Sequence, residues 1–208
     1  MLWILDRESV KNLPIPKVVL VLGGKRKSGK DYVADLIEKQ FFNNVMRFRI
    51  AEPIKSTFAE ENNLDLNILL SPGPLKEEWR QRMVKWSEEI RSTDPHYFTR
   101  KSIMLNKNNT SRSIWMLTDA RRECDMQYFT CDKEFFPESL IIRIKIIAST
   151  ETRTKRGYIF TSGIDDQTTE CGLDNFTAWD HIISNDGTSN ELLSQLEFVF
   201  RSVTKAIL

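Results

Sequence analysis

A glycine- and lysine-rich turn near the start of the chain separates a buried apolar stretch from a helical pattern. Val18 to Leu22 is an unbroken β-branched and apolar run, which is typical of a strand buried on both faces of a parallel sheet. From Val33 to Phe41, apolar residues recur at the spacing of an amphipathic helix. The sequence therefore predicts strand, loop and helix in that order, which is the opening unit of an α/β fold.

The turn itself, Gly24 to Asp31, reads GKRKSGKD and fits the phosphate-binding pattern GxxxxGK. Its glycines let consecutive backbone N–H groups face a polyphosphate, while Lys30 reaches the outer phosphates at the positive end of the helix. Asp31 stands where the pattern usually has Ser or Thr, and its carboxylate either binds Mg²⁺, directly or through water, or caps the helix. A lysine-rich surface turn is the alternative interpretation, but such a turn needs no pair of glycines at this junction.

Further strand candidates recur along the chain with helical patterns between them. They lie at 114–118, 140–147 and 181–184, with 46–50 as another, and a last helix is expected from Ser189 onward. Strands that alternate with helices favour right-handed crossovers and a parallel sheet. We therefore expect a three-layer α/β fold with a central parallel sheet and helices on both faces.

The length of 208 residues favours one substantial domain, expected at 17–208. Residues 1–16 contain Pro14 and Pro16, which favour an extended conformation, and are expected to be an N-terminal extension.

Composition excludes several classes of protein. The chain has 30 Lys plus Arg against 29 Asp plus Glu, a formal net charge of +1, which argues against a generic nucleic-acid or polybasic membrane binder. Its 3 cysteines lack CxxC spacing, so no disulfide framework or zinc site is expected and the chain reads as reduced and intracellular. No segment approaches the apolar length of a membrane span or a signal peptide.

The second strand candidate closes on an acid. The run from Ile114 ends at Asp119, a Walker-B-like arrangement that places a carboxylate near a metal and an attacked phosphate. An ordinary strand-end carboxylate is the alternative. Arg121 and Arg122 follow at once, at the carboxyl end of a strand where open α/β sheets bind ligands, and they favour anion recognition.

A helix expected from Pro74 to Arg91 has a basic edge. At 100° per residue, an apolar stripe of Leu75, Trp79, Met83, Trp86 and Ile90 is flanked by Lys76, Arg80 and Arg91. The glutamates fall on other faces, so cations and acids are expected to be segregated, as in the wall of an anion-binding cleft. The alternative is snorkelling of long cationic side chains around a core.

Two more segments carry cations. Residues 149–157 hold three cations against one acid and are expected to close over a nucleotide as a lid, with an exposed charged helix end as the alternative. Asp94 and Pro95 are expected to begin a further helix as N-cap and first residue, and that helix carries Arg100.

Four blocks of the chain together closely resemble the animal-type phosphomevalonate kinases, a P-loop family. They are GKRKSGKD at 24–31, TDARR at 118–122, RGYIF at 156–160 and ECGLDNF at 170–176. The family's loop has the same Asp, and the resemblance covers about residues 17 to 207.

The resemblance implies a nucleoside-monophosphate-kinase-like P-loop fold with an arginine-rich lid at about 149–161. It also implies transfer of the γ-phosphoryl group of ATP to 5-phosphomevalonate, with Mg²⁺, giving 5-diphosphomevalonate and ADP in the mevalonate route to isoprenoids and sterols. A monomer with small-molecule partners is expected. A cytosolic location is expected because the chain ends in Ala206, Ile207 and Leu208 where some family members have a peroxisomal tripeptide. A nucleoside-monophosphate kinase and a non-catalytic nucleotide-binding protein are the alternatives.

The resemblance also assigns residues to roles. The expected ATP-binding residues are Gly24, Lys25, Arg26, Lys27, Ser28, Gly29, Lys30, Asp31, Arg156, Asn185 and Gln195. The expected substrate-binding residues are Lys55, Lys76, Arg80, Arg91, Arg100, Arg121, Arg122 and Arg143. The expected catalytic residues are Lys30, Arg26, Arg121, Arg122 and Arg153, and the expected metal ligands are Asp31 and Asp119.

Overall fold

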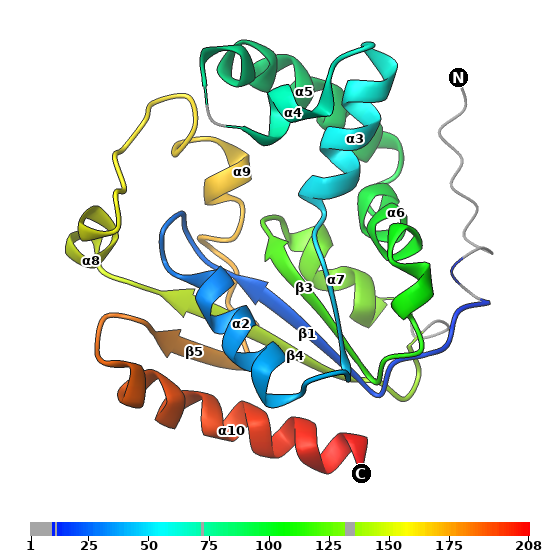
Figure 1. Ribbon diagram of the computed structural model, residues 1–208, viewed down its shortest axis with the longest axis vertical. Helices are drawn as coiled ribbons and strands as arrows, with labels where there is room; N and C mark the ends of the chain where they lie inside the picture. The colour runs from blue at the N-terminus through cyan, green and yellow to red at the C-terminus, as the bar shows by residue number, and fades with distance from the viewer. Residues whose placement is uncertain (1–9, 11, 72, 132–135) are drawn as a thin grey trace. The chain divides into compact units, whose positions relative to one another are not determined.

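Five parallel strands form one sheet in the order β2-β3-β1-β4-β5, seen in the computed structural model of the chain (Figure 1). The structure describes residues 10, 12–71, 73–131 and 136–208. The strands are β1 (Val18–Gly23), β2 (Val45–Phe48), β3 (Ile114–Ala120), β4 (Leu140–Ile147) and β5 (His181–Ser184). The expected parallel sheet is confirmed, although the strand expected at 46–50 lies at 45–48. Most of the expected extension, residues 1–16, lies outside the described residues.

Helices cover both faces of this sheet. On one face, α2 (Lys30–Gln40) and α10 (Ser189–Ile207) share a buried core with alternate strand residues such as Leu20 and Met116. On the other face, Trp115 packs edge-on against Phe136, whose ring also contacts Phe129 of α7 (Glu123–Cys131). The three-layer α/β architecture is therefore confirmed (Figure 1).

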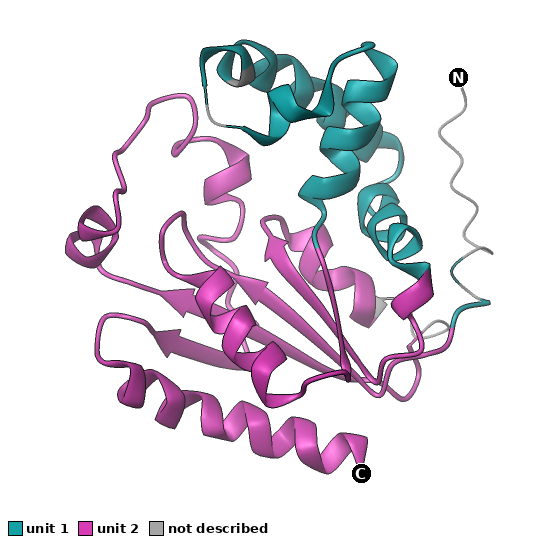
Figure 2. Cartoon of the chain, viewed as in Figure 1, with its two compact units in different colours: residues 1–13, 49–107 teal, residues 14–48, 108–208 magenta. Residues whose placement is uncertain are grey.

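The chain divides into two compact units, residues 1–13 with 49–107 and residues 14–48 with 108–208 (Figure 2). The second unit holds the sheet with α2, α7 and α10, together with α8 (Thr150–Lys155) and α9 (Thr168–Cys171). The first unit holds α3 (Ala51–Glu61), α4 (Leu66–Leu70), α5 (Pro74–Thr93) and α6 (Tyr97–Leu105). A short 3₁₀ turn, η1 (Lys107–Asn109), precedes β3.

The helical unit has its own small core. Phe58, Ala59 and Leu69 are buried, and Trp79 and Trp86 of α5 pack against them. The Phe58 and Trp86 rings meet edge-on, with centroids 5.4 Å apart. The apolar stripe expected on α5 is thus confirmed in its middle.

Two expectations for this unit are wrong in detail. Leu75 was expected in the buried stripe but is 56% exposed, because it lies in the first turn of α5, beyond the end of the core. The helix expected to begin at Asp94 and Pro95 begins at Tyr97 instead. Asp94 still acts near its start, since its carboxylate accepts the backbone N–H of His96 at 3.2 Å.

Among the described residues, no helix combines the length and the apolar character needed to cross a bilayer.

Candidate functional site

The carboxyl ends of β1, β3 and β4 meet at one edge of the sheet, because β1 lies between the other two strands. Gly23, the last residue of β1, is paired with Ala120 on one side and with Lys145 on the other. The loop after β1, the arginines after β3 and the segment after β4 therefore start at the same level. This is the strand-order reversal at which open α/β sheets bind ligands.

The loop 24–31 needs its glycines. Gly24 and Gly29 have φ of 147° and 93°, values that residues with a side chain rarely adopt. A Cβ at Gly24 would collide with the carbonyl oxygen of Ile146, and one at Gly29 would collide with the side-chain amide of Asn185. The hydroxyl of Ser28 is buried and has no hydrogen-bond partner among the described residues, so the loop keeps a spare polar group. These features fit an anion-binding loop.

Lys30 is folded back onto this loop. Its Nζ donates to the carbonyl oxygens of Gly24 and Lys25, the latter at 3.1 Å. Burial, and after it the charge of Arg121, lower the pKa of Lys30 from 10.5 to about 7, although Asp31 and Asp119 oppose this shift. The ammonium thus lies in a site that is already rich in positive charge.

The two expected metal ligands have different surroundings. Asp31 is exposed in the first turn of α2 and forms an ion pair with Arg47, whose Nη2 lies 3.0 Å from Oδ1. Asp119 is half-buried near the end of β3, where its charge favours the protonated forms of Lys30 and Arg121. Two carboxylates are enough for Mg²⁺, because this ion keeps several waters and binds proteins through one or two carboxylates plus substrate phosphates. No cluster of three or more His, Cys, Asp or Glu side chains suited to a metal occurs in the described part of the chain.

Arg121 and Arg122 are positioned by one carboxylate. Asp125, buried in α7, accepts the backbone N–H groups of both residues, at 2.9 Å and 3.1 Å. The Arg121 side chain donates from Nη1 to the carbonyl oxygen of Thr169 at 2.9 Å and forms an ion pair with Glu170. Burial lowers the pKa of Arg121 from its usual value.

The segment 149–157, which the sequence predicts to be a lid, contacts the loop directly. Arg153 of α8 donates from Nε to the carbonyl oxygen of Arg26 at 2.8 Å, with its guanidinium 3.8 Å from the centroid of the Tyr158 ring. Arg156 donates from Nη1 to the carbonyl oxygen of Ser28 at 3.2 Å. Arg153 and Arg156 therefore both lie at the loop.

The segment after β5 joins the same network. Nδ2 of Asn185 donates to the carbonyl oxygen of Ser28 at 2.9 Å, and Asn185 itself accepts from Arg156 Nη2 at 2.7 Å through its backbone oxygen. Gln195 instead bonds the end of β5, accepting from Ser184 N–H at 2.9 Å and donating to its carbonyl oxygen at 3.0 Å. The amide of Gln195 thus joins α10 to β5.

Asp186 is a residue that sequence reasoning missed. Its carboxylate accepts the backbone N–H and the hydroxyl of Ser149, each at 2.8 Å, at the start of α8. Hydrogen bonds from the Thr152 side chain and from Ser149 lower the pKa of Asp186 to about 2. Its place in an Asn-Asp-Gly turn after a strand is the sequence signal that could have indicated a role in fixing the start of α8.

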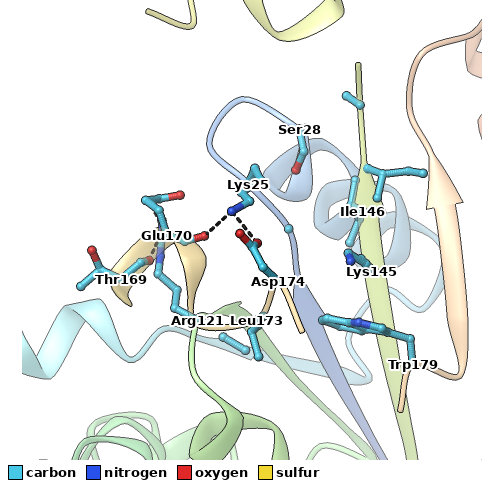
Figure 3. Close-up of a pocket in the computed structure, with 14 residues that line it drawn as sticks. Lys25, Ser28, Arg121, Lys145, Ile146, Thr169, Glu170, Leu173, Asp174 and Trp179 are labelled. Carbon is cyan, nitrogen blue, oxygen red and sulfur yellow. Dashed lines mark hydrogen bonds and ion pairs between the residues drawn. The ribbon is translucent and has the colours of Figure 1, made fainter. Parts of the chain in front are cut away.

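A cavity of about 90 Å³ opens beside the loop (Figure 3). Lys25, Arg121 and Lys145 line it, together with the acids Glu170 and Asp174. Nζ of Lys145 lies 5.7 Å from the centroid of the Trp179 ring. Lys145 was not among the residues expected from the sequence.

Arg143, which was expected at the substrate side, is not among the residues that line this cavity. It lies two positions earlier on β4 and donates from Nη1 to the carbonyl oxygen of Ala178 at 3.0 Å. Strand alternation places Arg143 and Lys145 on the same face, and only Lys145 lies level with Gly23.

The other expected substrate residues, Lys55, Lys76, Arg80, Arg91 and Arg100, belong to the unit that contains 49–107. The expected segregation of charges on α5 is wrong for Arg80, because its Nε and Nη2 lie 2.6 Å and 2.9 Å from the two carboxylate oxygens of Glu77. The two residues are three apart, within reach across one helical turn. Arg91 and Arg100 are buried, and Arg100 forms an ion pair with Asp94.

Comparison with known proteins gives consistent matches. A family profile described as phosphomevalonate kinase matches residues 22–135. A protein from Drosophila melanogaster named phosphomevalonate kinase is 35% identical over 191 residues, covering 89% of this chain and 99% of that relative. The crystal structure of TT1252 from Thermus thermophilus superposes with a TM-score of 0.53 at 14% identity, covering 91% of this chain and 98% of that one, a likeness of fold.

Proposed function

Because the chain belongs to the phosphomevalonate kinase family, we propose that the edge of the sheet formed by β1, β3 and β4 is where it carries out that family's reaction. The enzyme is a phosphotransferase that uses ATP to phosphorylate 5-phosphomevalonate in the mevalonate pathway, giving 5-diphosphomevalonate and ADP. The observation that carries the placement is the meeting of Lys30, Arg121 and Arg153 at one loop. The charges of Arg121 and Arg153 both lower the pKa of Lys30, so the three cations share one electrostatic site.

The chemistry of the acceptor suits a site built of cations. A phosphate acceptor has a second pKa near 6 and is mostly dianionic at pH 7, so no general base has to deprotonate it. Magnesium ATP carries about −2 and the acceptor about −3, so the bound pair repels strongly unless several cations lie between and around the phosphates. Arginines and lysines aimed at the transferring group also stabilise the charge of the transition state.

We assign ATP to the loop and the lid. Backbone N–H groups of 24–31 and the ammonium of Lys30 bind the outer phosphates, and Lys30 leaves its carbonyl partners to do so. Arg153 of α8 and Arg156, which follows α8, close over the phosphates and exclude water, while Asn185 holds the loop at Ser28. Gln195 is the weakest of the expected ATP contacts, because its amide is occupied by Ser184.

We assign the acceptor to Arg121 and Arg122. The substrate roles expected for Lys55, Lys76, Arg80, Arg91 and Arg100, which belong to the other compact unit, stay predictions. Burial and ion pairing hold Arg100 in one orientation, as anion recognition requires. We assign Lys145, in place of Arg143, to the acceptor together with Arg121 and Arg122, because Lys145 lines the cavity beside the loop.

Mg²⁺ fits the carboxylates available. Asp31 and Asp119 would hold it, with water and phosphate oxygens as the remaining ligands. The ion would supply positive charge that neutralises the phosphate oxygens. In the structure the Asp31 carboxylate forms an ion pair with Arg47, so a bound Mg²⁺ would compete with Arg47 for it.

Four further expectations stay predictions. They are the lid at 149–161, the single catalytic domain at 17–208, the monomeric state and the cytosolic location.

A coupled assay of ADP release tests the function. It compares 5-phosphomevalonate with AMP, UMP and GMP as acceptors for the purified protein. Turnover with phosphomevalonate alone is expected, since the substrate residues are cationic and suit a small acid. A preference for a nucleotide would assign the site to a nucleoside-monophosphate kinase, and ATP binding without any ADP formation would indicate a non-catalytic protein.

A further inference from the structure

One carboxylate holds a cation of the loop inside the cavity. Asp174 Oδ1 lies 2.5 Å from Nζ of Lys25, and both residues line the cavity (Figure 3). Their side chains are partly exposed, 36% for Lys25 and 48% for Asp174. The ion pair therefore borders water as well as the cavity.

The ammonium of Lys25 has no N–H left over. An ammonium group has three donors. In addition to Asp174, Nζ of Lys25 contacts the carbonyl oxygen of Glu170 at 3.0 Å and Sγ of Cys171 at 3.7 Å. A phosphate can bind this ammonium only if one of the three acceptors withdraws.

Asp174 is the acceptor best able to withdraw. The carbonyl oxygen of Glu170 belongs to α9, and a thiol sulfur is a weak acceptor that competes little with phosphate. Asp174 is a half-exposed side chain beyond α9, so water can replace Lys25 around it at small cost.

The neighbouring pair behaves differently. Arg121 has five N–H donors in a fixed fork, and the two described acceptors, Thr169 and Glu170, both bond its Nη1. Glu170 is 7% exposed at its side chain. Arg121 therefore has further N–H groups for a phosphate while Glu170 remains in place.

We propose that Asp174 is an internal counter-ion for Lys25, which it holds in the absence of phosphate and yields when a substrate phosphate enters the cavity. The inference rests on the proposed function of the site. It assigns Asp174 a part in controlling affinity: the carboxylate competes with the substrate for one ammonium, so every binding event includes the breaking of this ion pair. Phosphate then takes the position that Asp174 occupies in the free protein.

A competing carboxylate and an orienting carboxylate predict opposite changes in substrate affinity when the charge is removed. If Asp174 competes, its neutralisation strengthens substrate binding. If it orients Lys25, neutralisation weakens binding. Asp174→Asn keeps the shape of the side chain and removes the charge. Asp166→Asn is a matched control, because it removes the same charge from the same segment of the chain. The Asp166 carboxylate accepts hydrogen bonds from Ser162 and Gly163 of its own turn.

Isothermal titration calorimetry with MgATP and with 5-phosphomevalonate tests the proposal on the full chain. Asp174→Asn is expected to lower the Kd of one or both substrates about two- to fivefold relative to Asp166→Asn, the range that partly exposed ion pairs reach. A Kd that is unchanged or higher for both substrates would overturn it. Asp174→Ser serves as a second variant should Asp174→Asn not fold, and a thermal melt of each protein shows which variants fold.

The result is separable from the proposed function. Turnover of 5-phosphomevalonate by the wild-type protein tests that function and does not involve Asp174 variants. The comparison of the two Kd values, for MgATP and for 5-phosphomevalonate, between Asp174→Asn and Asp166→Asn tests the counter-ion without any measurement of turnover.

Discussion

The positive charge of Arg121, which follows β3, lowers the pKa of Lys30. Only the burial of Lys30 lowers that pKa more. Two cations held near each other in a partly dry site repel, and a bound polyanion relieves the repulsion.

Replacement of Lys30 with Met is expected to reduce kcat by a factor of about one hundred or more, the usual cost of removing one donor aimed at a transition state. The fold should persist, because a neutral side chain suits a site where burial disfavours the charge. Steady-state kinetics with a thermal melt check both statements. Lys39→Met, on the exposed side of the same helix, is the control and should leave kcat near wild type. A kcat close to wild type for Lys30→Met would remove this lysine from the phosphate site.

ATP binding is expected to take up a proton at pH 8. The pKa of Lys30 in the free protein is about 7, so the group is largely neutral at pH 8, and a bound phosphate favours the charged ammonium. Calorimetric titrations in two buffers of different ionisation enthalpy measure this uptake, which should be absent in Lys30→Met. Equal uptake by both proteins would locate the titrating group elsewhere.

The same shift makes stability depend on pH. Between pH 7 and 10.5 the unfolded chain keeps a proton on Lys30 that the folded chain has lost, so the unfolded state binds more protons. The free energy of unfolding should therefore rise with pH across this window as far as Lys30 contributes. Denaturant titrations of the wild type and of Lys30→Met at pH 7 and 9 compare the two slopes.

Replacement of Arg80 with Ala is expected to raise the KM for 5-phosphomevalonate about tenfold or more, the range for a lost hydrogen bond to a charged group, with little effect on the KM for ATP. Arg82→Ala is the control on the same helix, because Arg82 stacks on Trp79 with its guanidinium 4.3 Å from the ring centroid. An effect confined to ATP would place this helix on the nucleotide side.

Replacement of Asp31 with Ser is expected to retain part of the activity and to raise the Mg²⁺ concentration needed for half-maximal rate, because a hydroxyl is a weaker ligand than a carboxylate. Asp35→Ser is a matched control, since Asp35 also pairs with Arg47, at 2.5 Å, and lies one turn farther along α2. Identical metal dependence in the two variants would mean that Asp31 acts only through Arg47.

Much of the sheet could be predicted because its strands are rich in β-branched and other apolar residues. The bounds of β4 and β5 coincide with the predicted ranges 140–147 and 181–184. The loop could be predicted as well, since a strand and an amphipathic helix flank it. These signals are local in sequence, so they need no knowledge of the fold.

The choice between Arg143 and Lys145 could not be predicted. Alternation along a strand shows which residues share a face of the sheet. It does not show how far along the strand direction each residue lies from the loop that follows a different strand. That distance depends on the pairing of Lys145 with Gly23, a contact between residues far apart in sequence. The pairing of Arg80 with Glu77 likewise required side-chain positions, because a helical wheel separated the two by angle alone.

The carboxylate of Asp125 holds the backbone at both Arg121 and Arg122 while its own side chain stays inside the protein. A survey of inherited or random variants that have lost enzyme activity will therefore include substitutions of Asp125 as well as substitutions of Arg121 and Arg122. A variant of Asp125 will resemble a defect in substrate recognition, although the altered residue lies behind the cationic surface and not on it.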